Sequence, residues 1–193
     1  FRQKADSRIV RNAHMIDRGE HPDFNENSGD FFRLRRMQGG SCVDTIVELC
    51  KKRLPENMKI PSNQIQVLSP SRKGETGTVN LNKCLQAALN PPDEGKKEKL
   101  FGETVFRVGD RVIQIKNNYD IAWKDKLGKS GMGIYNGDIG TIVEIDTVSE
   151  YLKVDYDDRT ALYGFEMLNE LEHAWALTVH KSQVSEYRAV ILS

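Results

Sequence analysis

The sequence predicts an α/β fold with a small antiparallel β barrel inserted into it. Residues 1 to about 100 alternate helical and strand patterns, and strands that alternate with helices form mostly parallel sheets. Residues 104–171 instead contain short strand-like pieces separated by turns, which is typical of a small barrel. The apolar runs AWAL and AVIL then resume the first pattern. We therefore expect an α/β domain formed by residues 1–103 and 172–193, and a barrel at 104–171.

Two helices are predicted in the first sixty residues. Asp6 or Ser7 can cap the first helix, and Gly19 can end it. Ser41, followed by Asp44, is expected to start the second helix. Between the two helices, FFRL (31–34) is predicted as a short strand. The apolar residues with helical spacing are Ile9, Val10, Ala13 and Ile16 in the first helix, and Val43, Ile46, Val47, Cys50 and Leu54 in the second.

The next forty residues predict a strand, a polar loop and a third helix. QIQVLSP (64–70) has the composition of a buried strand, and Pro70 ends it. SRKGETG (71–77) is a polar loop, and residues 80–89 form a helix that stops at Asn90-Pro91-Pro92. PPDEGKKEK is expected to be a charged linker that leads into the barrel.

Turn residues divide the predicted barrel into strands. TVFRVGDRVIQI, GIYNGDIGTIVEID, EYLKVDYDD and TALYGFEML are the strand-like pieces. Asn136-Gly137 is a strong turn signal, because both residue types tolerate positive φ. AWKDKLGKSGMG (122–133) is expected to be a long, mobile loop.

Composition limits the possible classes of protein. Lys+Arg and Asp+Glu number 28 each among 193 residues, so the net charge gives no support for nucleic-acid binding. The three cysteines form no CxxC pair, so we expect no metal site and a reducing, cytoplasmic location. No apolar run approaches the ~20 residues that span a bilayer, so no membrane partner is expected. The chain starts at Phe1 and its first methionine is Met15, so we expect a piece of a longer protein.

The stretch TVHKSQVSEY (178–187) is the best candidate site. Its polar residues interrupt two apolar runs, and in open α/β sheets ligands bind beyond the carboxyl ends of the strands. A ligand-binding loop and a solvated loop are equally compatible with these residues alone. A set formed by His180, Ser182 and Glu186 in an unrelated hydrolytic enzyme is a further alternative, but no GxSxG motif surrounds Ser182.

Four segments together resemble a known family. FRQ (1–3) with SRIVRNAHMIDRG resembles motif IV and the following helix of RecD/TraA-like superfamily-one DNA helicases, the type that includes the exodeoxyribonuclease V alpha subunit. QVLSPSRKGETGTVNLNKCLQAALNP resembles the next strand, loop and helix, and GDRVIQIKNNYD with YNGDIGTI resembles the inserted SH3-like barrel. LTVHKSQVSEYRAVIL resembles motif V. The resemblance implies a truncated second RecA-like domain, of the P-loop NTPase type, with an SH3-like insertion.

The resemblance also implies half of an ATP site. Arg2 would act as an arginine finger, and Gln3, Gln183 and Glu186 would contact the nucleotide. The alternative for Arg2 is a solvated arginine near the start of the chain. The GxxxxGK[ST] phosphate cradle is absent, so ATP and Mg²⁺ are expected only in the full-length parent. We expect this chain alone to bind neither and to be inactive.

Single-stranded DNA is the partner that the resemblance implies, together with an N-terminal RecA-like domain of the same parent and further subunits of a helicase–nuclease complex. The implied DNA contacts are Thr178, His180, Ser69, Ser71, Arg72, Asn117 and Asn118. For the two asparagines the alternative role is turn formation. Val184 stands where the family has glycine, and a β-branched residue resists the positive φ that glycine allows. The alternative function is a non-catalytic module that binds nucleic acid or protein through the barrel.

Overall fold

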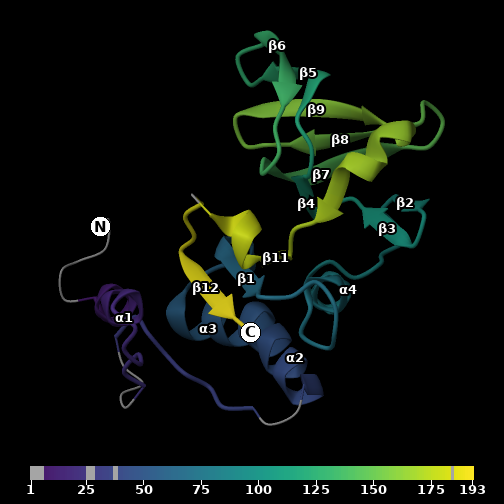
Figure 1. Ribbon diagram of the computed structural model, residues 1–193. Helices are drawn as coiled ribbons and strands as arrows, with labels where there is room; N and C mark the ends of the chain where they lie inside the picture. Colours follow the sequence, from purple (N-terminus) through teal and green to yellow (C-terminus); the bar gives the residue numbers. More distant parts are fainter. Residues whose placement is uncertain (1–6, 25–28, 37–38, 184) are drawn as a thin grey trace. The chain divides into compact units, whose positions relative to one another are not determined.

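A computed structural model describes residues 7–24, 29–36, 39–183 and 185–193 (Figure 1). The chain divides into two compact units, Phe1–Met37 and Gln38–Ser193, which we describe separately. Within the described ranges, no helix is long and apolar enough to cross a membrane.

The first unit contains the predicted helix, α1 (Arg8–Asp17). Ser7 is its N-cap, and the Ser7 hydroxyl accepts a hydrogen bond from the Val10 amide at 3.4 Å. The Asp30 carboxylate accepts from the Arg8 amide at 2.9 Å, which places a negative charge at the helix start. The prediction of a strand at 31–34 is wrong. Only Phe31 forms an isolated bridge, and Phe32 and Leu34 are exposed, because no extended ladder is available to them within the described part of this unit.

The second unit begins with a long helical segment. Helix α2 (Gly39–Glu48) starts two residues before the predicted Ser41, passes through a π-helical stretch (Leu49–Arg53) and continues as α3 (Leu54–Met58). Pro55 lies in the first turn of α3 and cannot donate a backbone hydrogen bond. The missing donor accounts for the wider π-helical turn that precedes α3. The predicted apolar face is confirmed, because Val43, Ile46 and Cys50 are buried.

A parallel three-stranded sheet forms the centre of this α/β part. Its order is β11-β1-β12, with β1 at Ile65–Ser69, β11 at Ala176–Thr178 and β12 at Ala189–Leu192. The predicted strands at AWAL and AVIL thus pair with the strand predicted at 64–70. Helix α4 (Thr78–Leu89) follows β1 and ends, as predicted, before Asn90-Pro91.

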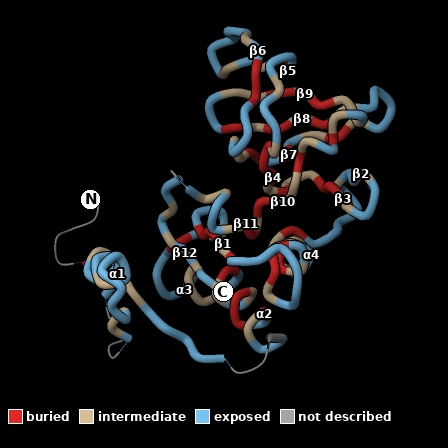
Figure 2. The backbone as a smooth tube through the Cα atoms, in the orientation of Figure 1, coloured by how far each residue is buried: buried red, intermediate tan, exposed pale blue. Residues whose placement is uncertain are grey.

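Strand β1 is buried on both faces (Figure 2). Ile65 and Val67 pack against Leu81 and Leu85 of α4 and against the inner face of α2. Leu68 faces the other way, into a second cluster with Leu177 and Ile113. Side chains alternate along a strand, so one short strand contributes to both cores.

The second sheet has seven antiparallel strands and is curled. Its order is β10-β4-β7-β8-β9-β5-β6. The strands are β4 (Arg111–Gln114), β5 (Asn118–Asp125), β6 (Ser130–Ile134), β7 (Ile139–Asp146), β8 (Tyr151–Asp155), β9 (Arg159–Gly164) and β10 (Leu171–His173). Thirteen buried residues, among them Phe106, Ile142, Leu152 and Tyr163, form its core.

Four details of this region differ from the sequence prediction. The expected linker contains β2 (Glu98–Phe101), which pairs with β3 (Thr104–Arg107) in a separate hairpin. The expected long loop at 122–133 is instead the β5–β6 hairpin, in which the Trp123 ring lies against Gly131. Residues Phe165–Glu170 form a 3-10 helix where a strand was expected. At the predicted turn only Gly137 has positive φ (102°), so the turn has one left-handed residue rather than two.

A buried polar network joins α4 to the curled sheet. The Asp110 carboxylate is fully buried and accepts from Gln86 Nε2 at 2.6 Å, Asn90 Nδ2 at 2.8 Å and the Arg107 amide at 2.7 Å. His173 Nε2 of β10 lies 3.2 Å from the same carboxylate. Buried polar groups of this kind stabilise a fold only when they are all paired, and here the pairs connect three separate elements.

Asp110→Ala should therefore destabilise the protein strongly. The substitution removes one of the two acceptors of each side-chain amide and the carboxylate acceptor of the Arg107 N–H, at about 1–3 kcal/mol for each N–H that stays unpaired. We expect a loss of about 3 kcal/mol or more in urea unfolding followed by circular dichroism. Asp146→Ala is the control, since Asp146 accepts from the Val148 and Ser149 amides at an exposed turn where water can replace it. Equal losses for the two variants would contradict the role of Asp110.

Candidate functional site

Two parallel strands end side by side at one edge of the three-stranded sheet. Ser69, the last residue of β1, pairs in register with Thr178, the last residue of β11. The loops that follow, 70–77 and 179–188, therefore leave from the same carboxyl edge. This is the position at which open α/β sheets bind ligands.

The loop after β11 starts with a 3-10 turn, Val179–Ser182. The Ser182 hydroxyl donates to the Val179 carbonyl at 2.8 Å, so it closes this turn and is not directed at His180. This geometry gives no support to a hydrolytic set based on Ser182. His180, Gln183 and Glu186 are exposed, so all three side chains are accessible from solvent.

The loop after β1 is wound tightly. Ser69 is buried, and its hydroxyl bonds to the Thr76 carbonyl at 2.8 Å and accepts from the Ser71 amide at 3.2 Å. A Cβ atom on Gly77 would lie 2.4 Å from the Lys73 carbonyl oxygen, so a larger residue there would force the loop to open. Ser69 thus holds the loop, while Ser71 and Arg72 are exposed on it.

Glu172 connects the two loops. Its carboxylate binds Arg72 at 2.9 Å and Lys181 at 2.8 Å. Burial acts to raise the pKa of this carboxyl, but the hydrogen bonds from Lys181 and Arg72 outweigh it, so the pKa lies below the ordinary value. The ionised carboxylate therefore fixes one cation from each loop at the sheet edge.

The two predicted asparagines lie in the curled sheet and organise its backbone. Asn117 Oδ1 accepts from the Asn136 amide at 2.9 Å. Asn118 Nδ2 donates to Glu170 at 3.0 Å, and its Oδ1 accepts from the Asp120 amide at 3.0 Å. These are the turn-forming contacts that the alternative interpretation predicts. Arg2, Gln3 and Val184 lie outside the described residues.

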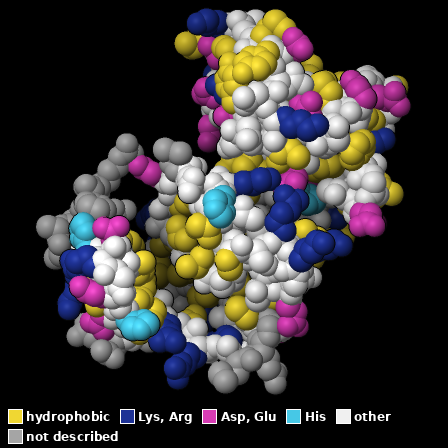
Figure 3. Space-filling model, in the orientation of Figure 1, with side chains coloured by type: hydrophobic (Ala, Val, Ile, Leu, Met, Phe, Trp, Pro, Cys, Tyr) yellow, Lys and Arg dark blue, Asp and Glu magenta, His cyan; other side chains and the backbone are white. Residues whose placement is uncertain are grey.

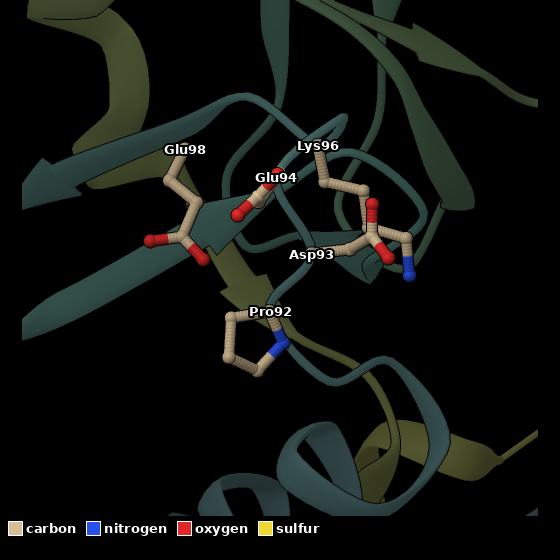
Figure 4. Close-up of a pocket in the computed structure, with 5 residues that line it drawn as sticks. All are labelled: Pro92, Asp93, Glu94, Lys96 and Glu98. Carbon is tan, nitrogen blue, oxygen red and sulfur yellow. The ribbon is translucent and has the colours of Figure 1, made fainter.

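A hollow of about 500 Å³ lies between α4 and β2 (Figure 4). Asp93, Glu94 and Glu98 line it, and the lining Lys96 ammonium donates to Asn90 Oδ1 at 2.7 Å. Helix α4 starts at the loop after β1, so this hollow at its far end lies away from the carboxyl edge. Three carboxylates repel phosphate, so this is not the nucleotide site. Among the described residues no group of three His, Cys, Asp or Glu side chains could hold a metal ion.

Comparison with known proteins gives the family resemblance. Residues 81–156 match the family model described as the SH3 domain of ATP-dependent RecD-like DNA helicases. The ATP-dependent RecD2 DNA helicase of Deinococcus radiodurans is 31% identical over 192 residues, 99% of this chain and 23% of the relative. The RecBCD enzyme subunit RecD of Buchnera aphidicola is 25% identical over 143 residues, 74% of this chain and 22% of the relative.

A solved structure of Bacteroides Pif1 bound to ssDNA aligns with the whole chain and 43% of its own, at 15% identity and a TM-score of 0.48. The chain spans less than a quarter of the length of the two RecD relatives. The sequence matches confirm the predicted resemblance: the chain is similar to part of RecD-like DNA helicases. A stand-alone binding module is not favoured by them.

The ion pairs of Glu172 with Arg72 and Lys181 predict a pH-dependent contribution to the stability of the fold. Glu172→Gln should lower the stability of the folded chain at neutral pH by about 1 kcal/mol or less, the scale of partly exposed ion pairs. Because the pKa of Glu172 is lowered by folding from 4.5, its contribution is present above that value and is lost as the pH falls through the folded-state pKa. Thermal unfolding at pH 7 and at pH 3 measures this. A difference between Glu172→Gln and the native chain that is as large at pH 3 as at pH 7 would contradict it.

Proposed function

Since the chain is related to the RecD-like DNA helicases, we propose that it forms part of an ATP-dependent DNA helicase motor. In this proposal residues 1–103 and 172–193 belong to a second RecA-like domain, and residues 104–171 are an inserted SH3-like barrel. The observation that carries the proposal is the common carboxyl edge of β1 and β11, from which both motif-bearing loops leave.

The nucleotide side of this edge is the loop after the 3-10 turn. We assign Gln183 and Glu186, which are exposed there, to the nucleotide. Arg2 and Gln3 of the FRQ motif lie outside the described residues and are assigned to the nucleotide by family resemblance alone. Phosphoryl transfer also needs a phosphate cradle and Mg²⁺ ligands, and the sequence has no GxxxxGK[ST] motif. ATP and Mg²⁺ are thus bound in the full-length parent, between this chain and an N-terminal RecA-like domain. Arg2 then stabilises the negative charge on the transferred phosphoryl group.

The DNA side consists of the strand ends and the first residues of each loop. We assign Thr178, His180, Ser71 and Arg72 to the backbone of a single strand, because hydroxyls and cations are its usual ligands. Ser69 acts by holding the loop that carries Ser71. Asn117 and Asn118 act by shaping the base of the β5–β6 hairpin beside this edge. Ile115, two residues before Asn117, packs in one cluster with Leu68 and Leu177, which supports placing the two asparagines near this edge.

The biological role that fits these contacts is movement along single-stranded DNA, 5′ to 3′ by family resemblance, in recombination and repair or in conjugation. Further subunits of a helicase–nuclease complex are the expected protein partners of the parent.

The test is steady-state ATP turnover by the full-length parent with and without an oligothymidylate. Arg2→Ala should lower turnover about 10³-fold or more in both conditions, the scale of an arginine finger. His180→Ala should weaken strand binding and the stimulated turnover while basal turnover stays nearly normal. His21→Ala, which changes another exposed histidine, is the control.

The 193-residue chain alone should show no Mg²⁺-dependent ATP hydrolysis above background. Robust hydrolysis by the chain that is abolished in Glu186→Ala would overturn the half-site assignment. Normal turnover of the Arg2→Ala parent would overturn the role of Arg2.

A further inference from the structure

A second hollow, of about 340 Å³, lies between the loop after β1 and helix α4. It is lined by Arg72, Lys73, Gly74, Val79, Asn80 and Lys83. Three of these six residues are cations and none is an acid, although the chain as a whole has zero net charge. On the face shown in Figure 3, Lys and Arg side chains gather between the curled sheet and α4. The lining of this hollow is therefore positively charged, although the whole chain is neutral.

The cations of this hollow differ in how they are held. Arg72 is fixed by Glu172, which also binds Lys181, the residue after His180. Lys73 and Lys83 are exposed, and neither forms an ion pair with another described residue. Two ammonium groups are thus available to an incoming anion, beside a guanidinium that is already oriented.

Backbone amides do not provide the attraction for an anion here. The N–H groups of Gly77, Thr78 and Val79 at the start of α4 donate to the carbonyls of Gly74 (3.1 Å), Ser71 (3.0 Å) and Arg72 (3.2 Å). These hydrogen bonds fix the loop against the start of α4 and leave these three N–H groups paired. They leave the lysine and arginine side chains as the groups that face a ligand.

We propose that this basic hollow, defined by Arg72, Lys73 and Lys83, binds a phosphodiester group of single-stranded nucleic acid. The inference deepens the proposed function and rests on it, since it extends the path of the strand from Thr178 and His180 along Lys181 and Arg72 to α4. The lining contains no aromatic ring on which a base could stack, so the hollow recognises the backbone and not the sequence. Lysine ammonium groups bind phosphate as point charges, and the Val79 side chain offers an apolar contact to a sugar.

Salt dependence gives a sharp test. For single strands each neutralised phosphate contributes about 0.7 to the slope of log K against log [salt]. The K73Q/K83Q double variant should therefore lower the slope by up to about 1.4, and removal of each lysine–phosphate interaction should weaken binding about fivefold at 0.1 M salt. The probe is a fluorescein-labelled oligothymidylate of about 16 nucleotides, and binding to the purified chain is followed by anisotropy.

Matched variants separate a specific site from a general charge effect. K51Q/K52Q removes the same charge from two exposed lysines of the π-helical stretch, which do not line the hollow, and should leave the slope unchanged. K73R/K83R keeps the charge and should retain binding. Thermal unfolding checks that all variants are folded, and competition by inorganic phosphate should be weak if the hollow takes a strand rather than a free ion.

The remaining outcomes separate failure of the phosphate site from failure of the proposed helicase function. If the chain binds the strand and His180→Ala weakens it, but K73Q/K83Q binds like the native chain or no worse than K51Q/K52Q, the hollow is not a phosphate site and the proposed function stands. If the native chain binds no strand even at low salt, the inference fails, while the proposed function is tested separately by ATP turnover of the full-length parent. Displacement of the strand by millimolar inorganic phosphate would show a site for a free anion and would also overturn the inference.

Discussion

The buried carboxylate of Asp110 is the constraint on which the arrangement of the second unit depends. Its oxygens accept hydrogen bonds from α4 and from the backbone that leads into β4, and His173 of β10 lies beside it. Asn82, one turn before Gln86 on α4, donates to the carbonyls of His173 and Ala176 and accepts from the Ala176 amide. Asn82, Gln86 and Asn90 are spaced four residues apart and therefore lie on one face of α4. This face binds the segment that leads from β10 of the curled sheet into β11.

This arrangement explains why ligands are expected at the strand ends and not on the faces of the sheet. Helices α2 and α4 cover one face of β1, and the other face packs into the cluster shared with Ile113 and Ile139. At the carboxyl edge, Glu172 fixes a cation from each loop.

The sequence predicted the elements of this fold better than it predicted their connections. Helical spacing in residues 43–54 and 80–89 and the apolar runs around β1, β11 and β12 located the starts of these elements to within about two residues. The β5–β6 hairpin was missed because a Lys-rich, Gly-rich stretch resembles a loop, and its strands depend on pairing with β9. Glu172 and Asp110 gave no local signal either. One partner of each lies far away in sequence: Arg72 is 100 residues from Glu172, and Gln86 is 24 residues from Asp110, so only the folded chain brings these pairs together.

Hydrogen–deuterium exchange of the chain, with and without an oligothymidylate, tests most directly whether the carboxyl edge is the nucleic-acid face. Slower exchange on binding should concentrate in the loop after β1, in the first turn of α4 and in residues 178–183, because these segments lie at the proposed contact. The turn between β7 and β8 should be unchanged, since it follows the end of β7 that lies away from the pairing with β4. Protection confined to the β7–β8 turn or to the acidic hollow beside β2, with none in residues 178–183, would contradict the account.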